Sequence, residues 1–112
     1  MNCESDFPIE MNPKQASEYL RAHPDTFLLD VRENEEHAYC SIKGSLNVPL
    51  AILPERLNAI DAKAAILAYC HHGIRSLSAV RLLRAKGFAK ASSIRGGIDL
   101  WTTEIDPNMP RY

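Results

Sequence analysis

The sequence has little of what marks membrane, secreted or nucleic-acid-binding proteins. No apolar run approaches the roughly 20 residues needed to cross a membrane. The polar and acidic residues 1–6 lack the basic region and apolar core of a signal peptide. A formal net charge of −1 gives no concentrated basic surface for binding phosphates. We therefore expect a cytoplasmic protein whose partners include neither nucleic acid nor membrane.

Cysteine is also scarce, with three residues at positions 3, 40 and 70. An odd number without a CxxC pair indicates neither a disulfide framework nor a zinc knuckle, so we expect reduced thiols. Cys3 lies within residues 1–6, which we expect to be flexible, and we assign it no role. A chain of 112 residues with 46% apolar and 24% charged residues has the size and composition of one soluble globular domain.

Apolar runs and helical spacings alternate along the chain. Short buried strands are predicted at residues 8–11, 27–30, 46–49, 64–69 and 91–94. Apolar residues spaced by three and four predict helices over residues 13–23, 33–39, 50–60 and 75–86, with a final turn around Leu100 and Trp101. This alternation favours a single α/β domain over residues 1–112, with a mainly parallel five-stranded sheet and helices on both faces.

Polar residues follow two of the predicted strands. In parallel sheets, ligands bind outside the carboxyl ends of the strands. Asp30 and Arg32 close one strand and Cys70 follows another, so we expect all three at the same edge. Asp30 and Arg32 either orient the cysteine loop through hydrogen bonds or form a structural ion pair that fixes the turn. Of these two interpretations we favour the ion pair.

The most informative segment is the loop Cys70-His71-His72-Gly73-Ile74-Arg75-Ser76, which opens a stretch with helical character. Gly73 lets the backbone turn tightly so that N–H groups point inward, and a helix N-terminus adds positive potential. Such surroundings favour the thiolate, the form of cysteine that attacks. Cys70 alone could be a small buried hydrophobic residue. Together with Gly73 and Arg75, it is better explained as a nucleophile that acts on an anionic substrate.

The size of this loop bears on the substrate. Four residues separate Cys70 from Arg75, whereas cysteine-dependent phosphatases use a longer loop that encircles a tetrahedral phosphate. The smaller cradle suits a single sulfur added to the cysteine. A cysteine phosphatase or an arsenate reductase is therefore the less favoured interpretation.

The adjacent His71 and His72 raise the question of a metal site beside Cys70. Neighbouring side chains are expected to diverge, and the sequence offers no spaced partner pair, so we expect no metal. We expect the two histidines instead to tune the local charge and to select the donor or the acceptor.

The loop Cys70–Ser76 resembles the active-site loop of the single-domain rhodaneses, which are sulfurtransferases. Three other segments are similar to this family in the same order: Asp30-Val31-Arg32, Ile42–Pro49 and Gly96–Trp101. The ending Glu104–Tyr112 is similar to rhodanese domains attached to adenylyltransferases of molybdopterin and thiocarboxylate sulfur pathways. The combination covers most of the chain.

The resemblance implies a rhodanese-like domain with a double-displacement mechanism. Cys70 would take the sulfane sulfur of thiosulfate or a persulfide donor, become a persulfide itself, and pass the sulfur to a thiophilic acceptor. Arg75 would hold the small anionic donor, and the backbone N–H groups of residues 71–76 would stabilise the persulfide, without a cofactor or a metal. A protein sulfur donor or acceptor also fits. The alternative is a sulfur-relay or non-catalytic rhodanese-like binding module.

One departure from the family concerns the residues before Ile42. The family commonly has Gly-His there, whereas this chain has Cys40-Ser41. We expect Cys40 to be structural. The other interpretation is a second thiol that resolves a Cys70 persulfide into a disulfide.

Overall fold

Five parallel strands form one sheet in the computed structural model, which describes residues 7–112. The strands are β1 (Glu10–Met11), β2 (Phe27–Asp30), β3 (Leu46–Asn47), β4 (Ile66–Tyr69) and β5 (Ala91–Ile94). They lie in the order β1-β5-β4-β2-β3, and every pair is parallel. The predicted five-stranded sheet is confirmed and is wholly rather than mainly parallel. Cys3 and the predicted flexibility of residues 1–6 lie outside the described residues.

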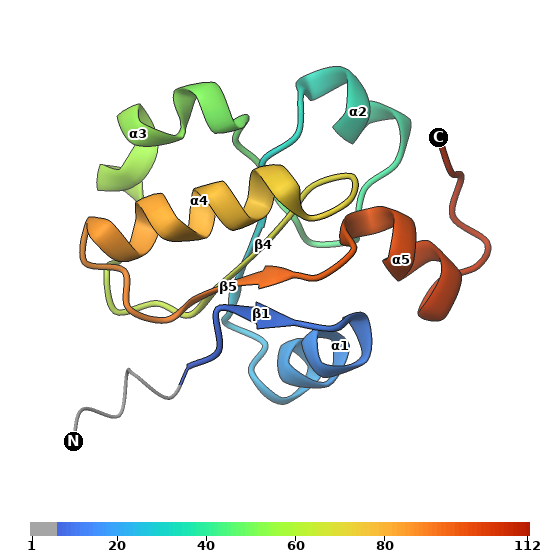
Figure 1. Cartoon of the computed structure of the whole chain (residues 1–112), viewed down its shortest axis with the longest axis horizontal. Helices are drawn as coiled ribbons and strands as arrows, with labels where there is room; N and C mark the ends of the chain where they lie inside the picture. Colours follow the sequence, from blue (N-terminus) through green and yellow to red (C-terminus); the bar gives the residue numbers. More distant parts are fainter. Residues whose placement is uncertain (1–6) are drawn as a thin grey trace.

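Helices cover both faces of this sheet, as predicted. Helices α3 (Leu53–Arg56) and α4 (Ile74–Ala85) pack on one face, and α1 (Pro13–Ala22) and α5 (Gly97–Glu104) pack on the other (Figure 1). Successive strand residues point to opposite faces. Leu29 of β2 therefore joins the core beneath α4, whereas Leu28 joins the core beneath α5. Within residues 7–112, no helix has the length and apolar character to traverse a bilayer.

The start of α1 is set by its sequence. The Asn12 side chain accepts a hydrogen bond from the Gln15 backbone N–H at 2.8 Å, and the Gln15 side chain accepts one from the Asn12 N–H at 2.9 Å. This reciprocal capping box satisfies two amide groups that a helix start otherwise leaves unpaired. Pro13 occupies the first turn, where it has no hydrogen bond to lose. The helix ends at Ala22, before Pro24, as predicted.

Two predicted helical segments differ in detail. Residues 50–60 form 3₁₀ turns at Leu50–Ile52 (η2) and Leu57–Ala59 (η3) around the single turn of α3, rather than one helix. Pro54 has no N–H to donate to the carbonyl group four residues earlier, which weakens a continuous helix here. The final helix, α5, extends over Gly97–Glu104 and is longer than the single turn predicted. Trp101 buries its ring under this helix, as expected.

Candidate active site

Cys70 lies at the carboxyl end of β4, and its side chain is almost fully buried. Its sulfur accepts hydrogen bonds from the backbone N–H groups of Gly73 at 3.1 Å and Ser76 at 3.3 Å. The Ser76 hydroxyl lies 3.5 Å from the same sulfur. Two amide groups thus point at one sulfur atom, which is an arrangement that stabilises negative charge on sulfur, while the thiol donates to the Ser76 hydroxyl.

The turn from the loop into α4 depends on Gly73. Its backbone has φ of +102°, and a side chain there would crowd the backbone nitrogen of Gly96. Glycine adopts this left-handed conformation without the steric cost that other residues meet. The turn brings the first amide groups of α4 towards Cys70, as the sequence predicted.

The N-terminus of α5 holds the other side of the loop. The Ile98 N–H donates to the Cys70 carbonyl group at 2.8 Å, and the Asp99 N–H donates to the His71 carbonyl group at 3.1 Å. A Cβ atom on Gly97 would overlap both carbonyl groups. The loop is therefore fixed between two helix starts, one that faces the sulfur and one that faces the backbone carbonyl groups.

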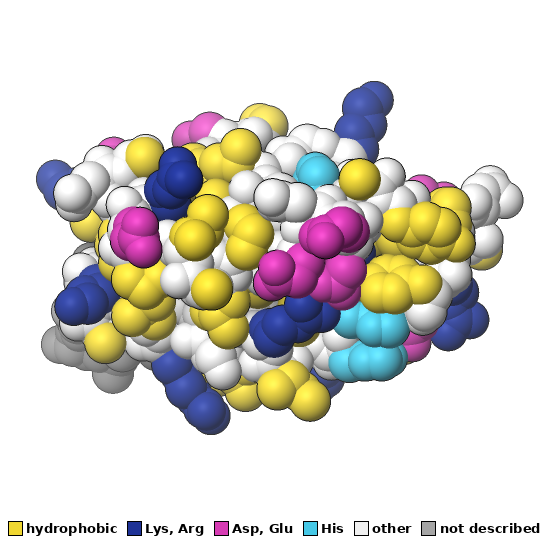
Figure 2. Space-filling view, turned by 90° about the horizontal axis from the view of Figure 1, so that it is seen from above, with side chains coloured by type: hydrophobic (Ala, Val, Ile, Leu, Met, Phe, Trp, Pro, Cys, Tyr) yellow, Lys and Arg dark blue, Asp and Glu magenta, His cyan; other side chains and the backbone are white. Residues whose placement is uncertain are grey.

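The surface around this loop combines charged and apolar side chains. Ile74 of the loop is 79% exposed, and Tyr39 of α2 (Asn34–Tyr39) is 57% exposed. Acidic side chains gather over α2 on this face of the molecule, beside basic and histidine side chains (Figure 2). The surface over the cysteine loop thus carries side chains of several chemical kinds.

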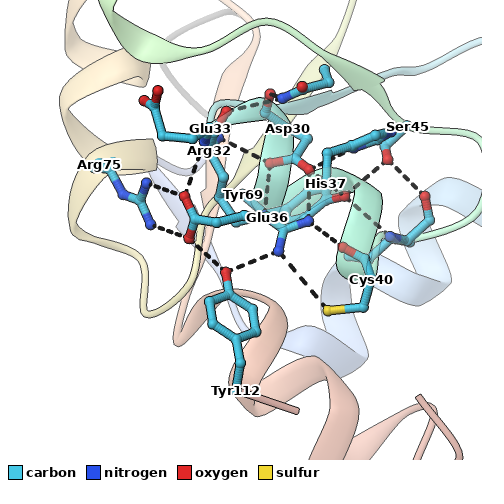
Figure 3. A network of polar contacts seen from close by, with 12 residues as sticks. Asp30, Arg32, Glu33, Glu36, His37, Cys40, Ser45, Tyr69, Arg75 and Tyr112 are labelled. Atoms are coloured by element: carbon cyan, nitrogen blue, oxygen red, sulfur yellow. Dashed lines mark hydrogen bonds and ion pairs between the residues drawn. The ribbon is translucent and has the colours of Figure 1, made fainter. Parts of the chain in front are cut away.

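Arg75 is held by Glu36 of α2. The guanidinium group donates to both carboxylate oxygens, at 2.7 and 2.9 Å (Figure 3). Such a bidentate pair is the strongest geometry available to arginine. The hydrogen bond from Arg75 lowers the pKa of Glu36 from 4.5 to about 2, and the same bond raises the pKa of Arg75. The predicted donor-binding cation is therefore already paired within the protein.

Asp30 and Arg32 form the buried ion pair that we favoured. Both side chains are fully buried, and Arg32 Nη2 lies 2.7 Å from Asp30 Oδ2. Arg32 also donates to the Cys40 carbonyl group at 2.6 Å, which ties the end of β2 to the end of α2. Asp30 further accepts from the Tyr69 hydroxyl at 3.2 Å. The pair thus fixes the turn at the sheet edge below the site.

Tyr112 links this ion pair to the Arg75–Glu36 pair, which we call the clamp. Its hydroxyl accepts from Arg32 at 2.9 Å and donates to Glu36 at 2.7 Å. Its ring stacks on His71, with 3.9 Å between ring centroids. Burial raises the pKa of Tyr112 to about 12, so the hydroxyl keeps its proton at neutral pH. The segment whose sequence resembles a family tail therefore lies against the cysteine loop.

The two histidines of the loop do not diverge, contrary to expectation. Their ring centroids lie 3.9 Å apart, because Tyr112 packs on the far side of the His71 ring. With Asp99 they place three potential ligand atoms within 4.8 Å of one another. Arg111 binds the Oδ1 atom of Asp99 at 2.9 Å, and His72 Nε2 lies 3.6 Å from Oδ2. The structure thus brings together three possible ligands that the sequence did not indicate.

Cys40 and Cys70 are both free and buried. Cys40 packs in the core beneath α1 and α5, whereas Cys70 packs in the core beneath α3 and α4. The Cys40 sulfur lies 4.0 Å from Arg32, beside the buried ion pair. These surroundings support the structural role that we expected for Cys40.

Comparisons with known proteins agree on one family. The sequence model of the rhodanese-like domain matches residues 12–104. The adenylyltransferase and sulfurtransferase MOCS3-2 of Zea mays is 41% identical over 92 residues, which span 76% of this chain and 19% of that protein. A sulfurtransferase of Allochromatium vinosum is 30% identical over 92 residues, which span 82% of this chain and 86% of that protein. The chain thus spans about a fifth of its MOCS3 relatives but most of the bacterial one.

A solved structure shares this fold. The crystal structure of a rhodanese-related protein from Thermoplasma volcanium is 29% identical to this chain, and the two superpose with a TM-score of 0.79. The match covers 92% of this chain and 98% of that one. The superposition therefore extends over most of both chains.

We predict that Gly97→Ala destabilises the protein by more than about 3 kcal/mol, because the added methyl group overlaps the carbonyl groups of Cys70 and His71. Gly87→Ala is the matched control, since Gly87 also has positive φ but nothing within 4 Å of an added Cβ. It should cost only about 1 kcal/mol. Urea unfolding measures both. Equal losses would contradict the close approach of α5 to the loop.

We predict that Glu36→Gln lowers the free energy of unfolding by about 1 kcal/mol near pH 7, since water screens this partly exposed pair. Glu36 has a pKa of about 2 when folded and 4.5 ordinarily, so its contribution is complete above 4.5 and fades as pH falls towards 2. The difference between the wild type and the variant should shrink over that range. Glu35→Gln, an exposed change on the same helix, should show no such trend.

Proposed function

The chain belongs to the rhodanese-like domain family, and on this premise we propose that it is a sulfurtransferase in which Cys70 carries the sulfur as a persulfide. The observation that carries this proposal is the convergence of the Gly73 and Ser76 amide groups on the Cys70 sulfur. Sulfurtransferase activity in the names of relatives supports it. The short loop between Cys70 and Arg75 favours a bound sulfur atom over a phosphate.

The reaction proceeds in two displacements at one sulfur atom. The Cys70 thiolate attacks the outer sulfur of thiosulfate, the S–S bond of the donor breaks, and sulfite leaves with the electron pair. Cys70 then carries a persulfide whose outer sulfur bears the negative charge. A thiophilic acceptor such as cyanide attacks that sulfur and leaves as thiocyanate, which restores the thiolate. The amide groups of Gly73 and Ser76 offset the charge on sulfur at each stage.

Arg75 is the cation that binds the anionic donor beside the cysteine loop. Its side chain is 35% exposed, and the carboxylate of Glu36 occupies both of its outer nitrogens. An anionic donor such as thiosulfate competes with Glu36 for this guanidinium group. The affinity for the donor therefore depends on the strength of the Arg75–Glu36 pair as well as on Arg75 itself.

The same pair gives weight to the alternative of a sulfur relay. A persulfide on a protein donor carries less charge than thiosulfate, so it has less need of a free cation. Acidic side chains over α2 also oppose a small dianion approaching this face (Figure 2). A relay protein would turn over thiosulfate poorly, yet accept sulfur rapidly from the persulfide of a cysteine desulfurase. A panel of donors, with the mass of Cys70 as the readout, separates the two.

We predict that thiosulfate adds the mass of one sulfur atom to Cys70 and that adding cyanide removes it with release of thiocyanate. Cys70→Ser should abolish both steps, because the hydroxyl is a much weaker nucleophile than a thiolate. Cys40→Ser is the control and should load normally, since Cys40 packs in a different core. Intact-protein and peptide mass spectrometry measure the loading. An unmodified Cys70 with every donor would overturn the proposal.

We predict opposite effects on thiosulfate use from the two members of the clamp. Arg75→Ala should raise the KM for thiosulfate about tenfold, because the donor loses its cation and meets an unpaired Glu36. Glu36→Gln should lower that KM about threefold, because it frees the guanidinium group. Steady-state kinetics at fixed ionic strength measure both. Unchanged KM values in the two variants would remove Arg75 from donor binding.

A further inference from the structure

Two buried serines form a chain of hydrogen bonds behind Cys70. Ser76 of α4 and Ser93 of β5 are fully buried, with their hydroxyl oxygens 2.7 Å apart. The Ser76 hydroxyl lies 3.5 Å from the Cys70 sulfur. The thiol is therefore linked through Ser76 to Ser93 on the neighbouring strand.

The next residue back along β5 provides a contrast. Ser92 is as fully buried as Ser93, yet among the described residues its hydroxyl oxygen has no hydrogen-bond partner. Successive strand residues face opposite sides of the sheet, so only Ser93 faces α4 and the thiol. A buried hydroxyl is costly unless it is paired. Of the two serines, Ser93 alone is paired, and its partner touches the nucleophile.

Each hydroxyl has one proton to donate but can accept two hydrogen bonds. While Cys70 is a thiol, its S–H donates to the Ser76 oxygen, and the Ser76 hydroxyl can donate to the Gly73 carbonyl group at 3.2 Å. Once the sulfur is an anion, it donates nothing and needs donors. Ser76 must then turn its proton towards the sulfur, and its oxygen loses the hydrogen bond that the thiol supplied.

We propose that Ser93 is a positioning residue that keeps the Ser76 oxygen paired when Cys70 ionises. By donating to the Ser76 oxygen, Ser93 leaves the Ser76 proton free to point at the anionic sulfur of Cys70. Ser93 donates to the Ser76 oxygen in both states, and only the Ser76 proton turns, from the Gly73 carbonyl group to the sulfur. Ser93 thereby favours the thiolate that takes up sulfur. This role rests on the proposed function of Cys70 as a sulfur carrier, but it makes a claim about the thiol itself.

The test compares Ser93→Ala with Ser92→Ala, which removes an adjacent, equally buried hydroxyl on the other face. Two rates are measured at one fixed pH: alkylation of Cys70 by iodoacetamide, and loading of Cys70 by thiosulfate, both followed by mass spectrometry. Ser93→Ala should slow both about tenfold, the effect of losing one buried hydrogen bond, and should leave the KM for thiosulfate unchanged. Ser92→Ala should leave both rates unchanged.

A second pair of variants controls for packing. Ser93→Thr and Ser93→Val add nearly the same volume, but only threonine keeps the hydroxyl. The threonine variant should be alkylated at close to the wild-type rate, and the valine variant about tenfold more slowly. Unfolding midpoints in urea check that both variants are folded. Equal alkylation rates in the threonine and valine variants, or in Ser93→Ala and Ser92→Ala, would overturn the role of Ser93. If wild-type Cys70 is alkylated but never takes up sulfur, the proposed function fails, while the alkylation rates still test the role of Ser93.

Discussion

The candidate site depends on one constraint, the confinement of the cysteine loop between the N-termini of α4 and α5. The amide groups of α4 face the Cys70 sulfur, and those of α5 bind the carbonyl groups of Cys70 and His71. A loop held on its carbonyl side cannot rotate its peptide groups, so its N–H groups stay aimed at the thiol. The positive ends of two helices thereby act on the same few atoms. The rest of the site is built around this fixed loop.

Around the loop, charged side chains and Tyr112 form a continuous network of hydrogen bonds and ion pairs rather than isolated pairs. Asp30 binds Arg32, Tyr112 bridges Arg32 and Glu36, and Glu36 holds Arg75 (Figure 3). This network runs from fully buried groups at the sheet edge to the partly exposed Arg75. Burial of the inner pair fixes the position of the outer one, so Arg75 is held in one orientation.

Much of the fold and the turn after Cys70 could be predicted from the sequence, because the signals for both are local. Apolar runs located the strands, and the glycine after Cys70 located the turn. The clamp on Arg75 could not be predicted, since Glu36 lies 39 residues away in the sequence and on a helix whose charges look solvated. The expected divergence of His71 and His72 was wrong, because the ring of Tyr112 packs on them. Contacts of this kind depend on how distant segments meet in three dimensions.

The contact between Gly97 and the loop also limits how this site can evolve. A loop long enough to surround a phosphate needs at least one inserted residue, and that residue would have to push the backbone outward. On one side the first turn of α5 is already in contact with the carbonyl groups of Cys70 and His71. An inserted residue therefore has to bulge on the side of the loop that faces away from α5.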